Sequence, residues 1–550
     1  MSAPVAPLDL ARVGDPRLRE RLDRVRELLA GRAVHVLAPS GTEGSTVIDF
    51  LLALGVGPIT AHDLAPDAAA FAAAFHRTHP WLEEPARAAA LRRLLGAPIT
   101  LHYRGRYLEG IADAGLVVLP QSWFRHPENA PLRAVREQVP CTSMTRLFFE
   151  VAPGPVVGVT GTNGKFTVAM LVAEMVRQAG QAVVASGNDR THVPALYALD
   201  RLTARTWLVL EVSNRQLVDL APRGRDPRLD EVTYSPHIGV VTNLAPHHLD
   251  DHGSLEAYAA VKASLLARQG PGDHAVLNLD DPHTRAMVGV TAGTVSWFSA
   301  AEPVERGAWV AGGRLWVRPP DGPGGAPSAQ GRPARPVLGL RDLPLPGPAM
   351  VANALAACAA AACAGVPVEA MAAVLRRFRG FPYRFAYAGT FGGVAAYEDS
   401  LATNPAAAAA AIRALDRPFL LIAGGWRRGA TPQDFTPMVE ALQASGLCKA
   451  VLLIGAAAPV LAAALDALPA DRRPTVVRAG TLEAAVAEAA RLAVEGDALL
   501  LSPGCESFDQ FADYRERGDR FRALLPQLGP AAPDPDGGGD RRAPGKVTGN

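Results

Sequence analysis

The chain has 550 residues, enough for about three domains, and its 49% hydrophobic and 20% charged residues allow ordinary globular cores. Lys and Arg number 55 against 54 Asp and Glu, so the net charge of +1 gives no basic footprint for nucleic acid. The five cysteines form no CxxC pair, which is typical of reduced thiols in a cytoplasmic protein. The N-terminal segment meets charges too soon for a signal peptide. The longest apolar stretch, 354–366, is shorter than the roughly 20 residues of a membrane span, so we expect a buried helix there and no membrane partner.

The first predicted domain, residues 1–151, is an α/β unit. Residues 16–30 have helical spacing, and apolar runs at 33–38, 59–63 and 115–120 predict strands. A polar loop at 39–44 follows the first strand, and Asp63 lies about 20 residues beyond it, as in dinucleotide-binding folds. The glycines of the GxGxxG pattern are mostly absent, so we do not expect NAD to bind. Residues 64–110 are helical in composition but fit no clear pattern.

The most informative stretch runs from Val156 to Val168, where an apolar strand leads into a loop and then into a helical segment. The loop consists of Thr160, Gly161, Thr162, Asn163, Gly164 and Lys165. Glycines let a backbone wrap a phosphate and a lysine offsets its charge, so this order of parts indicates a nucleotide site. The strict pattern has a glycine where Val159 stands and a hydroxyl residue, which holds Mg²⁺, where Phe166 stands. A chance strand, loop and helix is the alternative interpretation.

Two further strands of this second domain end in polar residues. The run 206–213 ends with Glu211 in a polar segment, and the run 237–243 leads into histidines at 247, 248 and 252. Ligands collect at the carboxyl ends of parallel strands, so these ends should converge on the loop. The histidines are also compatible with a polar turn or an incidental metal trap. Tyr258 and Lys262 share one face of a predicted helix, where a lone lysine is normally solvated.

The third predicted domain, 382–528, has strand candidates at 419–423, 450–454 and 498–501 that alternate with helices rich in Ala and Leu. Residues 318–337 predict a mobile surface loop, and the tail 529–550 is too rich in Pro and Gly to fold. The predicted fold class is therefore α/β with three domains. These are an N-terminal Rossmann-like domain, a central P-loop ATPase-type parallel sheet at 152–381 and a C-terminal Rossmann-like domain.

Ten motifs, in this order, resemble those of the Mur ligase family, and specifically its MurD branch, over about residues 30–528. They are TGTNGK at 160–165, GN at 187–188, EVSNRQL at 211–217, NLAPHHLD at 243–250, YAAVK at 258–262, NLDDP at 278–282, GFPYR at 380–384, EDSLATNP at 398–405, GGWRR at 424–428 and LSPGCESFDQF at 501–511. The last motif is the most specific, because its length and order leave little room for chance.

The resemblance implies an ATP-dependent, ADP-forming ligase that adds D-glutamate to UDP-MurNAc-L-alanine through an acyl phosphate, in peptidoglycan precursor synthesis. It implies two Mg²⁺ sites, a cytoplasmic location and a monomer. Domain closure about the 380–384 hinge would exclude water from the acyl phosphate.

The resemblance also implies a role for each matching residue. The ATP-binding residues would be Thr160, Gly161, Thr162, Asn163, Gly164, Lys165, Thr167, Asn353, Arg384 and Asp399. Glu211, His248 and a carbamylated Lys262 would hold the metal ions, and Lys165, Lys262 and His248 would be catalytic. The substrates would be bound by Asn188, Ser213, Thr403, Arg428, Ser507 and Phe508.

Several residues depart from the family pattern where chemistry is expected. Phe166 puts one Mg²⁺ site in doubt unless Thr167 supplies the hydroxyl, and Met350 removes an adenine contact. Leu401 stands where the family has a lysine that binds the incoming carboxylate, a role that Arg428 would take over in part. Two alternatives follow: a Mur-type ligase for a different amino acid, and a catalytically weak nucleotide-binding paralogue that acts by interaction.

Overall fold

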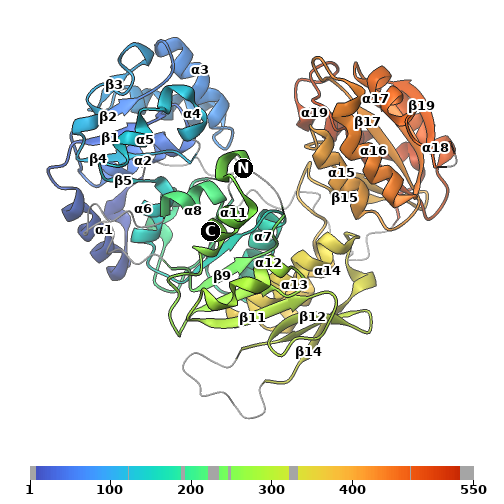
Figure 1. The fold of residues 1–550 in the computed structure, drawn as a ribbon, viewed down its shortest axis with the longest axis horizontal. Helices are drawn as coiled ribbons and strands as arrows, with labels where there is room; N and C mark the ends of the chain where they lie inside the picture. Colours follow the sequence, from blue (N-terminus) through green and yellow to red (C-terminus); the bar gives the residue numbers. More distant parts are fainter. Residues whose placement is uncertain are drawn as a thin grey trace. The chain divides into compact units, whose positions relative to one another are not determined.

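The computed structural model describes residues 8–121, 123–187, 193–220, 235–245, 249–320, 332–470 and 472–532. The chain divides into two compact units, Met1–Val337 with Ala352–Val374 and Leu338–Val351 with Leu375–Asn550. Three largely parallel sheets with intervening helices make up these units, so the predicted α/β class is confirmed (Figure 1). The domain boundaries at 151 and 381 stay predictions.

The first sheet has five parallel strands in the order β3-β2-β1-β4-β5. They are β1 (Val34–Leu37), β2 (Ile59–His62), β3 (Thr100–His102), β4 (Leu116–Val118) and β5 (Cys141–Thr142). Its helices are α1 (Pro16–Leu29), α2 (Thr42–Ala53), α3 (Ala68–Thr78), α4 (Glu84–Leu95), α5 (Leu132–Val135) and α6 (Met144–Val151). The strands predicted at 33–38, 59–63 and 115–120 are β1, β2 and β4. The unassigned region 64–110 contains α3, α4 and β3.

The second sheet has nine strands in the order β14-β13-β12-β11-β10-β9-β6-β8-β7. They are β6 (Val156–Thr160), β7 (Val183–Ser186), β8 (Trp207–Glu211), β9 (Ile238–Val241), β10 (His274–Asn278), β11 (Thr294–Ser299), β12 (Gly307–Ala311), β13 (Arg314–Arg318) and β14 (Arg335–Gly339). The accompanying helices are α7 (Lys165–Gln178), α8 (Asn214–Leu220), α10 (Leu249–His252), α11 (Leu255–Ala263), α12 (Pro282–Arg285), α13 (Pro348–Cys363) and α14 (Val368–Arg377). The strands from β7 to β12 pair in parallel, and β13 turns back against β12.

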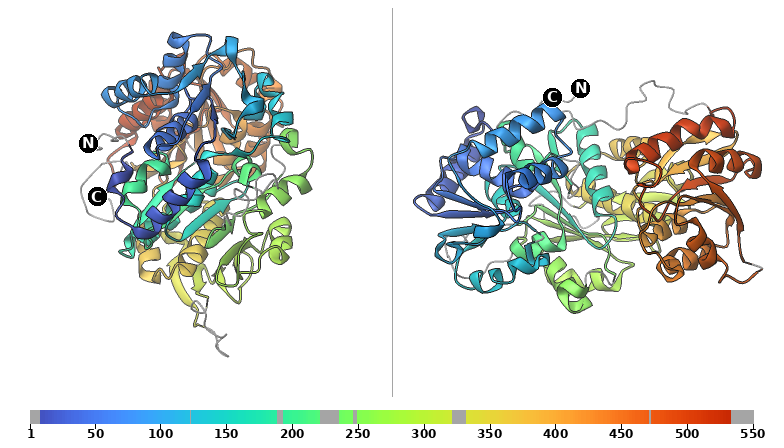
Figure 2. Two further views of the ribbon diagram at one scale, coloured as in Figure 1. Left: turned by 90° about the vertical axis from the view of Figure 1, so that its left-hand side faces the viewer. Right: turned by 90° about the horizontal axis from the view of Figure 1, so that it is seen from above.

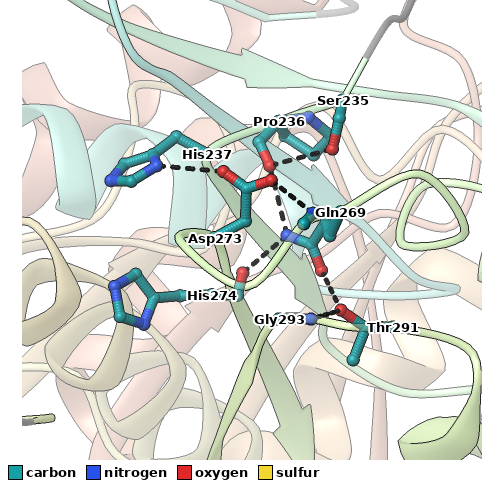
Figure 3. A network of polar contacts seen from close by, with 9 residues as sticks. Ser235, Pro236, His237, Gln269, Asp273, His274, Thr291 and Gly293 are labelled. Carbon is teal, nitrogen blue, oxygen red and sulfur yellow. Dashed lines mark hydrogen bonds and ion pairs between the residues drawn. The ribbon is translucent and has the colours of Figure 1, made fainter. Parts of the chain in front are cut away.

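A side-chain amide ties together the amino ends of β9, β10 and β11 (Figure 3). Gln269 donates to the carbonyls of Pro236 (3.1 Å) and His274 (2.7 Å) and accepts from the Thr291 hydroxyl (2.9 Å). Asp273 accepts from the backbone of Gly270 and lies 3.1 Å from a ring nitrogen of His237. Because these parallel strands all run in the same direction, the network stabilises the amino-terminal end of the sheet, opposite the end that carries the phosphate loop.

The third sheet, in the orange to red part of the ribbon in Figure 2, has the order β15-β16-β20-β17-β18-β19, with only β15 antiparallel to its neighbour. Its strands are β15 (Ala386–Phe391), β16 (Val394–Glu398), β17 (Phe419–Gly424), β18 (Cys448–Ile454), β19 (Thr475–Gly480) and β20 (Ala498–Leu501). Its helices are α15 (Pro405–Ala414), α16 (Thr436–Ser445), α17 (Ala458–Leu465), α18 (Leu482–Leu492) and α19 (Tyr514–Leu524). The predicted strands 419–423, 450–454 and 498–501 are β17, β18 and β20.

Three predictions about individual segments meet the structure in different ways. The buried helix expected at 354–366 is confirmed by α13, in which residues 354–361 are at most 1% exposed. The predicted loop 318–337 is partly wrong, because β13 reaches Arg318 and β14 begins at Arg335, while residues 321–331 lie outside the described residues. The first residues of the predicted tail pair with β15, where the Ala532 amide donates to Thr390. Among the described residues, no helix is long and apolar enough to cross a membrane.

Candidate active site

The predicted phosphate loop connects the end of β6 to the start of α7. All five residues of β6 are buried, since the strand lies between β8 and β9. Gly161 and Gly164 have φ of +137° and +81°, which favour glycine, and an added Cβ at Gly161 would lie 2.0 Å from the Thr242 hydroxyl. Helix α7 begins at Lys165, so the positive end of its dipole lies beside the loop.

The residues that follow β9 hold this loop in place. The amides of Thr162 and Asn163 donate to the Asn243 carbonyl (2.8 Å) and side-chain oxygen (3.0 Å). The Thr242 hydroxyl donates to the Asn163 carbonyl at 2.6 Å. The Lys165 ammonium donates to the Thr162 carbonyl at 2.9 Å. The loop is therefore preformed by bonds to the neighbouring strand.

A buried lysine lies behind the loop. Lys262 is 1% exposed, and its Nζ donates to the Thr160 hydroxyl at 3.1 Å, while that hydroxyl donates to the Val212 carbonyl at 2.7 Å. Burial, reinforced by the charge of Lys165 and opposed by that of Glu211, lowers the pKa of Lys262 to about 6. Lys262 is therefore buried, whereas a lone lysine on a helix is normally solvated.

The expected helical pair of Tyr258 and Lys262 is in place on α11. The Lys262 Nζ lies 5.1 Å from the centre of the Tyr258 ring, within the range of a cation–π contact. The Tyr258 hydroxyl lies 3.4 Å from that of Thr162, so the ring also contacts the phosphate loop. Both side chains therefore connect α11 to the loop.

Glu211 ends β8, and its backbone pairs with Val159 of β6, next to the loop. The predicted metal ligand His248 and the substrate residue Asn188 both lie outside the described residues. Of the predicted histidine cluster only His252 is described, and its ring nitrogen lies 2.8 Å from the Asn214 side-chain nitrogen. No group of three or more His, Cys, Asp or Glu in the described part of the chain has the arrangement of a metal site.

The residue after Lys165 faces the protein interior. Phe166 is 7% exposed and packs in the first turn of α7, whereas Thr167 is half-buried. On α13, Asn353 lies against the loop, because an added Cβ at Gly164 would lie 2.1 Å from its side-chain oxygen. The structure thus brings Asn353, whose role in ATP binding stays a prediction, to the phosphate loop.

The predicted substrate residue Ser213 lies where the first and second sheets meet. Its hydroxyl donates to the Gln121 side-chain oxygen at 3.0 Å, and the backbone N–H of Gln121 donates to the Glu43 carboxylate at 2.8 Å. Gln121 follows β4, and Glu43 lies in the first turn of α2, which follows β1. Sequence reasoning missed Gln121, although its place after a predicted strand, at the carboxyl end of the sheet, was a usable signal.

The remaining predicted residues lie in the second unit, where all but Arg384, which precedes β15, follow the carboxyl ends of strands. Asp399 follows β16, accepts from the Ser502 hydroxyl (2.8 Å) and the Phe385 amide (2.9 Å), and has a pKa raised to about 7 by burial. Arg384 is exposed, and its positive charge acts on Asp399 to lower that pKa.

Four predicted substrate-binding residues lie in three loops of this unit. Thr403 is half-buried after β16, and Arg428 is exposed after β17. After β20, Ser507 is 2% exposed and Phe508 is 62% exposed, with the Phe508 ring edge-on to Trp426 at 6.3 Å between centroids. Since β16, β20 and β17 are neighbours in the sheet, the structure brings these loops together.

Residues 159–315 match the Mur ligase middle domain, and residues 383–505 match the family described as Mur ligase, glutamate ligase domain. The UDP-N-acetylmuramoylalanine--D-glutamate ligase of Pelotomaculum thermopropionicum is 36% identical over 400 residues, which cover 72% of the chain and 81% of that relative. The ligase of the same name from Rubrobacter xylanophilus is 38% identical over 427 residues, or 76% of the chain and 88% of the relative. The solved structure of UDP-N-acetylmuramate-alanine ligase MurC from Thermotoga maritima aligns with a TM-score of 0.48 at 18% identity, covering 89% of the chain and 98% of MurC.

Proposed function

This chain belongs to the Mur ligase family, and we propose that it is an ATP-dependent ligase that joins D-glutamate to UDP-N-acetylmuramoyl-L-alanine in peptidoglycan precursor synthesis. The relatives named for this activity support the proposal, since the match covers 81% and 88% of their own lengths. The structural observation that carries it is the phosphate loop between β6 and α7, with buried Lys262 bonded to Thr160 behind it.

The proposed reaction has two steps. The carboxylate of UDP-N-acetylmuramoyl-L-alanine takes the γ-phosphoryl group of ATP, which forms an acyl phosphate and ADP. The amine of D-glutamate then attacks the acyl carbon, phosphate leaves, and the amine loses a proton. Phosphoryl transfer depends mainly on positioning and on offsetting charge, and the glycine loop and Lys165 suit both tasks.

Mur ligases use ATP and Mg²⁺, and the groups beside the loop suit both. Oxygen ligands are preferred by Mg²⁺, and Glu211 offers a carboxylate at the end of β8. We propose that Glu211, His248 and Lys262 hold the metal, which offsets phosphate charge when bound. With a pKa of about 6, Lys262 is mainly neutral at pH 7, and a neutral amine is the form that combines with carbon dioxide to give a carbamate.

The two organic substrates would lie at strand ends in different loops. We propose that Ser213 and Asn188 bind the UDP-linked substrate, and the bond from Ser213 to Gln121 adds the latter to this group. For the amino acid we propose Thr403, Ser507, Phe508 and Arg428, whose guanidinium would bind a carboxylate. Leu401 stands in the same loop as Thr403, at the position where the family has a lysine. We therefore propose that Arg428 supplies the positive charge that binds the carboxylate.

Two residues that depart from the family pattern favour the two alternative functions. Leu401 favours a Mur-type ligase that uses a different amino acid. Phe166 favours a nucleotide-binding paralogue with weak catalysis, because its side chain is buried and brings no hydroxyl to the loop.

The test is ADP release by the purified chain with ATP, Mg²⁺, UDP-N-acetylmuramoyl-L-alanine and a panel of amino acids. We expect turnover with D-glutamate alone, a product of matching mass, and a loss of at least about 100-fold in Lys165→Met. Turnover with another amino acid instead would support a Mur-type ligase for that amino acid. ATP binding without turnover on any amino acid would support the nucleotide-binding paralogue.

A further inference from the structure

The largest fully buried side chain among the described residues is an arginine, Arg517, on α19. It is 0% exposed, and no carboxylate oxygen of the described residues lies within ion-pair distance of its guanidinium. Burial lowers the pKa of Arg517 to about 10, so the side chain stays cationic at neutral pH. A buried cation is stable only where its N–H groups are hydrogen-bonded. In Arg517 the acceptors of these bonds all lie in loops that follow strands of the third sheet.

The guanidinium bonds to the two loops that follow β16 and β20. On the β16 loop, Nε donates to the Ser400 hydroxyl (3.0 Å) and Nη2 to the Ser400 carbonyl (2.9 Å). On the β20 loop, Nη2 donates to the Cys505 carbonyl (3.1 Å) and Nη1 to the Glu506 carbonyl (3.2 Å). Four of the five N–H donors of Arg517 are therefore used on loop atoms.

The loop after β17 is joined to the same group. The Trp426 amide donates to the Glu506 carbonyl at 2.8 Å, and the Glu506 amide donates back to Trp426 at 3.0 Å. Gly425 lies directly against the arginine, because an added Cβ would be 3.1 Å from Arg517 Nη1 and 2.3 Å from the Glu506 carbonyl. One guanidinium thus contacts or links all three loops.

These loops carry the whole set proposed to bind the amino acid. Ser507 directly follows Glu506, Thr403 lies three residues after Ser400, and Arg428 lies two residues after Trp426. The four hydrogen bonds of Arg517 go to Ser400, Cys505 and Glu506 and not to those binding residues themselves. We propose that Arg517 is a positioning residue that fixes the three loops relative to one another and so sets the affinity for the amino acid. This inference rests on the proposed function for the identity of the ligand.

Arginine suits this task better than lysine does. Its planar fork donates in several fixed directions at once, whereas an ammonium group is a compact point charge on a flexible stem. Arg517→Lys keeps the positive charge but not the directions of the bonds. The variant therefore separates positioning from simple charge.

The same helix supplies a matched control. Arg520 is 52% exposed, and its Nε donates to Glu483 at 2.7 Å, away from the three loops. We expect Arg517→Lys to raise the KM for D-glutamate about 10- to 100-fold, since a displacement of about 1 Å can have effects of that size. The KM for the UDP-linked substrate should stay within about 2-fold, and Arg520→Lys should match wild type throughout.

A second readout needs no substrate. Amide hydrogen exchange in 399–404, 425–428 and 505–508 should accelerate at least about 10-fold in Arg517→Lys, while strands β16, β17 and β20 keep their protection. Ser400→Ala, which removes one acceptor, should give a smaller change of the same kind in both readouts. If Arg517→Lys has a wild-type KM for D-glutamate, an equal rise in every KM, or faster exchange throughout the sheet, the inference is wrong. Lack of turnover by the wild-type chain would defeat the proposed function instead, and the exchange experiment would still decide the role of Arg517.

Discussion

Two glycines at opposite ends of α7 allow the role of the phosphate loop to be tested with an internal control. Gly164 begins the helix with φ +81°, and Gly180 follows its end with φ +77°. Their surroundings differ: an added Cβ at Gly164 would lie 2.1 Å from the Asn353 side-chain oxygen, whereas at Gly180 nothing lies within 4 Å. Alanine at either site has the same backbone penalty, but only at Gly164 does it also collide with a neighbour.

The magnitudes of the two effects can be separated. The left-handed backbone costs a non-glycine residue about 1–2 kcal/mol, so both variants should lose roughly 1 kcal/mol of unfolding free energy. Relief of the contact at Gly164 requires a shift of about 1 Å in the loop or in Asn353, both proposed to bind ATP. A misplacement of that size can lower a rate about 100-fold. We therefore expect kcat/KM for ATP to fall about 100-fold in Gly164→Ala and to change less than about 2-fold in Gly180→Ala.

The assay is steady-state ADP release, with thermal unfolding measured on the same preparations. The double variant Gly164→Ala with Asn353→Ala adds a cycle: because the collision needs both side chains, the combined loss should be smaller than the sum of the two single losses. The steric reasoning is refuted if Gly164→Ala keeps its kcat/KM within about 3-fold of wild type. It is equally refuted if Gly180→Ala loses as much activity as Gly164→Ala.

Three further outcomes are expected. Burial and the neighbouring His35 and His102 lower the pKa of His62 to about 3 from 6.5, so stability present above pH 6.5 is lost as the pH falls toward 3. The share of this loss due to His62 is about 2 kcal/mol by pH 5, so the difference in unfolding free energy between pH 7.5 and 5, measured with urea, should be smaller by about that amount in His62→Gln. Gln269→Leu should lower the unfolding free energy by about 3 kcal/mol, because it leaves two buried carbonyls without their donor, while activity at low temperature persists. Thr160→Val, nearly the same in shape, should lower kcat about 10-fold or more by removing the partner of the buried lysine; wild-type kcat would count against that role.

Several of the strands that were predicted from the sequence are buried on both faces. Residues 498–501 form β20 and residues 419–423 lie within β17, because inner strands of a parallel sheet are continuous apolar runs. Strands β7 and β19 were missed: they lie at sheet edges and are partly exposed, so their sequences carry no such run. What defines those strands is pairing with a neighbour distant in sequence.

In the candidate site too, local features were predictable from the sequence, and features that depend on contacts distant in sequence were not. The loop of Gly161 and Gly164 was predictable because backbone conformation is a local property written in glycines. The burial of Lys262 and Arg517 was not, since each lies in a helix whose packing against strand ends depends on the whole sheet. Spacing in the sequence shows that Lys262 shares a helix face with Tyr258, but it does not show that this face is buried away from water.

Burial has opposite chemical consequences for these two cations, and the difference explains why each residue type stands where it does. The same removal from water that brings the pKa of Lys262 to about 6 brings that of Arg517 only to about 10. At neutral pH the lysine is therefore mainly an uncharged amine beside the phosphate loop, whereas the arginine remains a charged donor of fixed geometry. An arginine at 262 would keep its charge and could not react as an amine. A lysine at 517 would be a compact point charge on a flexible stem and could not hold the bonds to all three loops in their fixed directions.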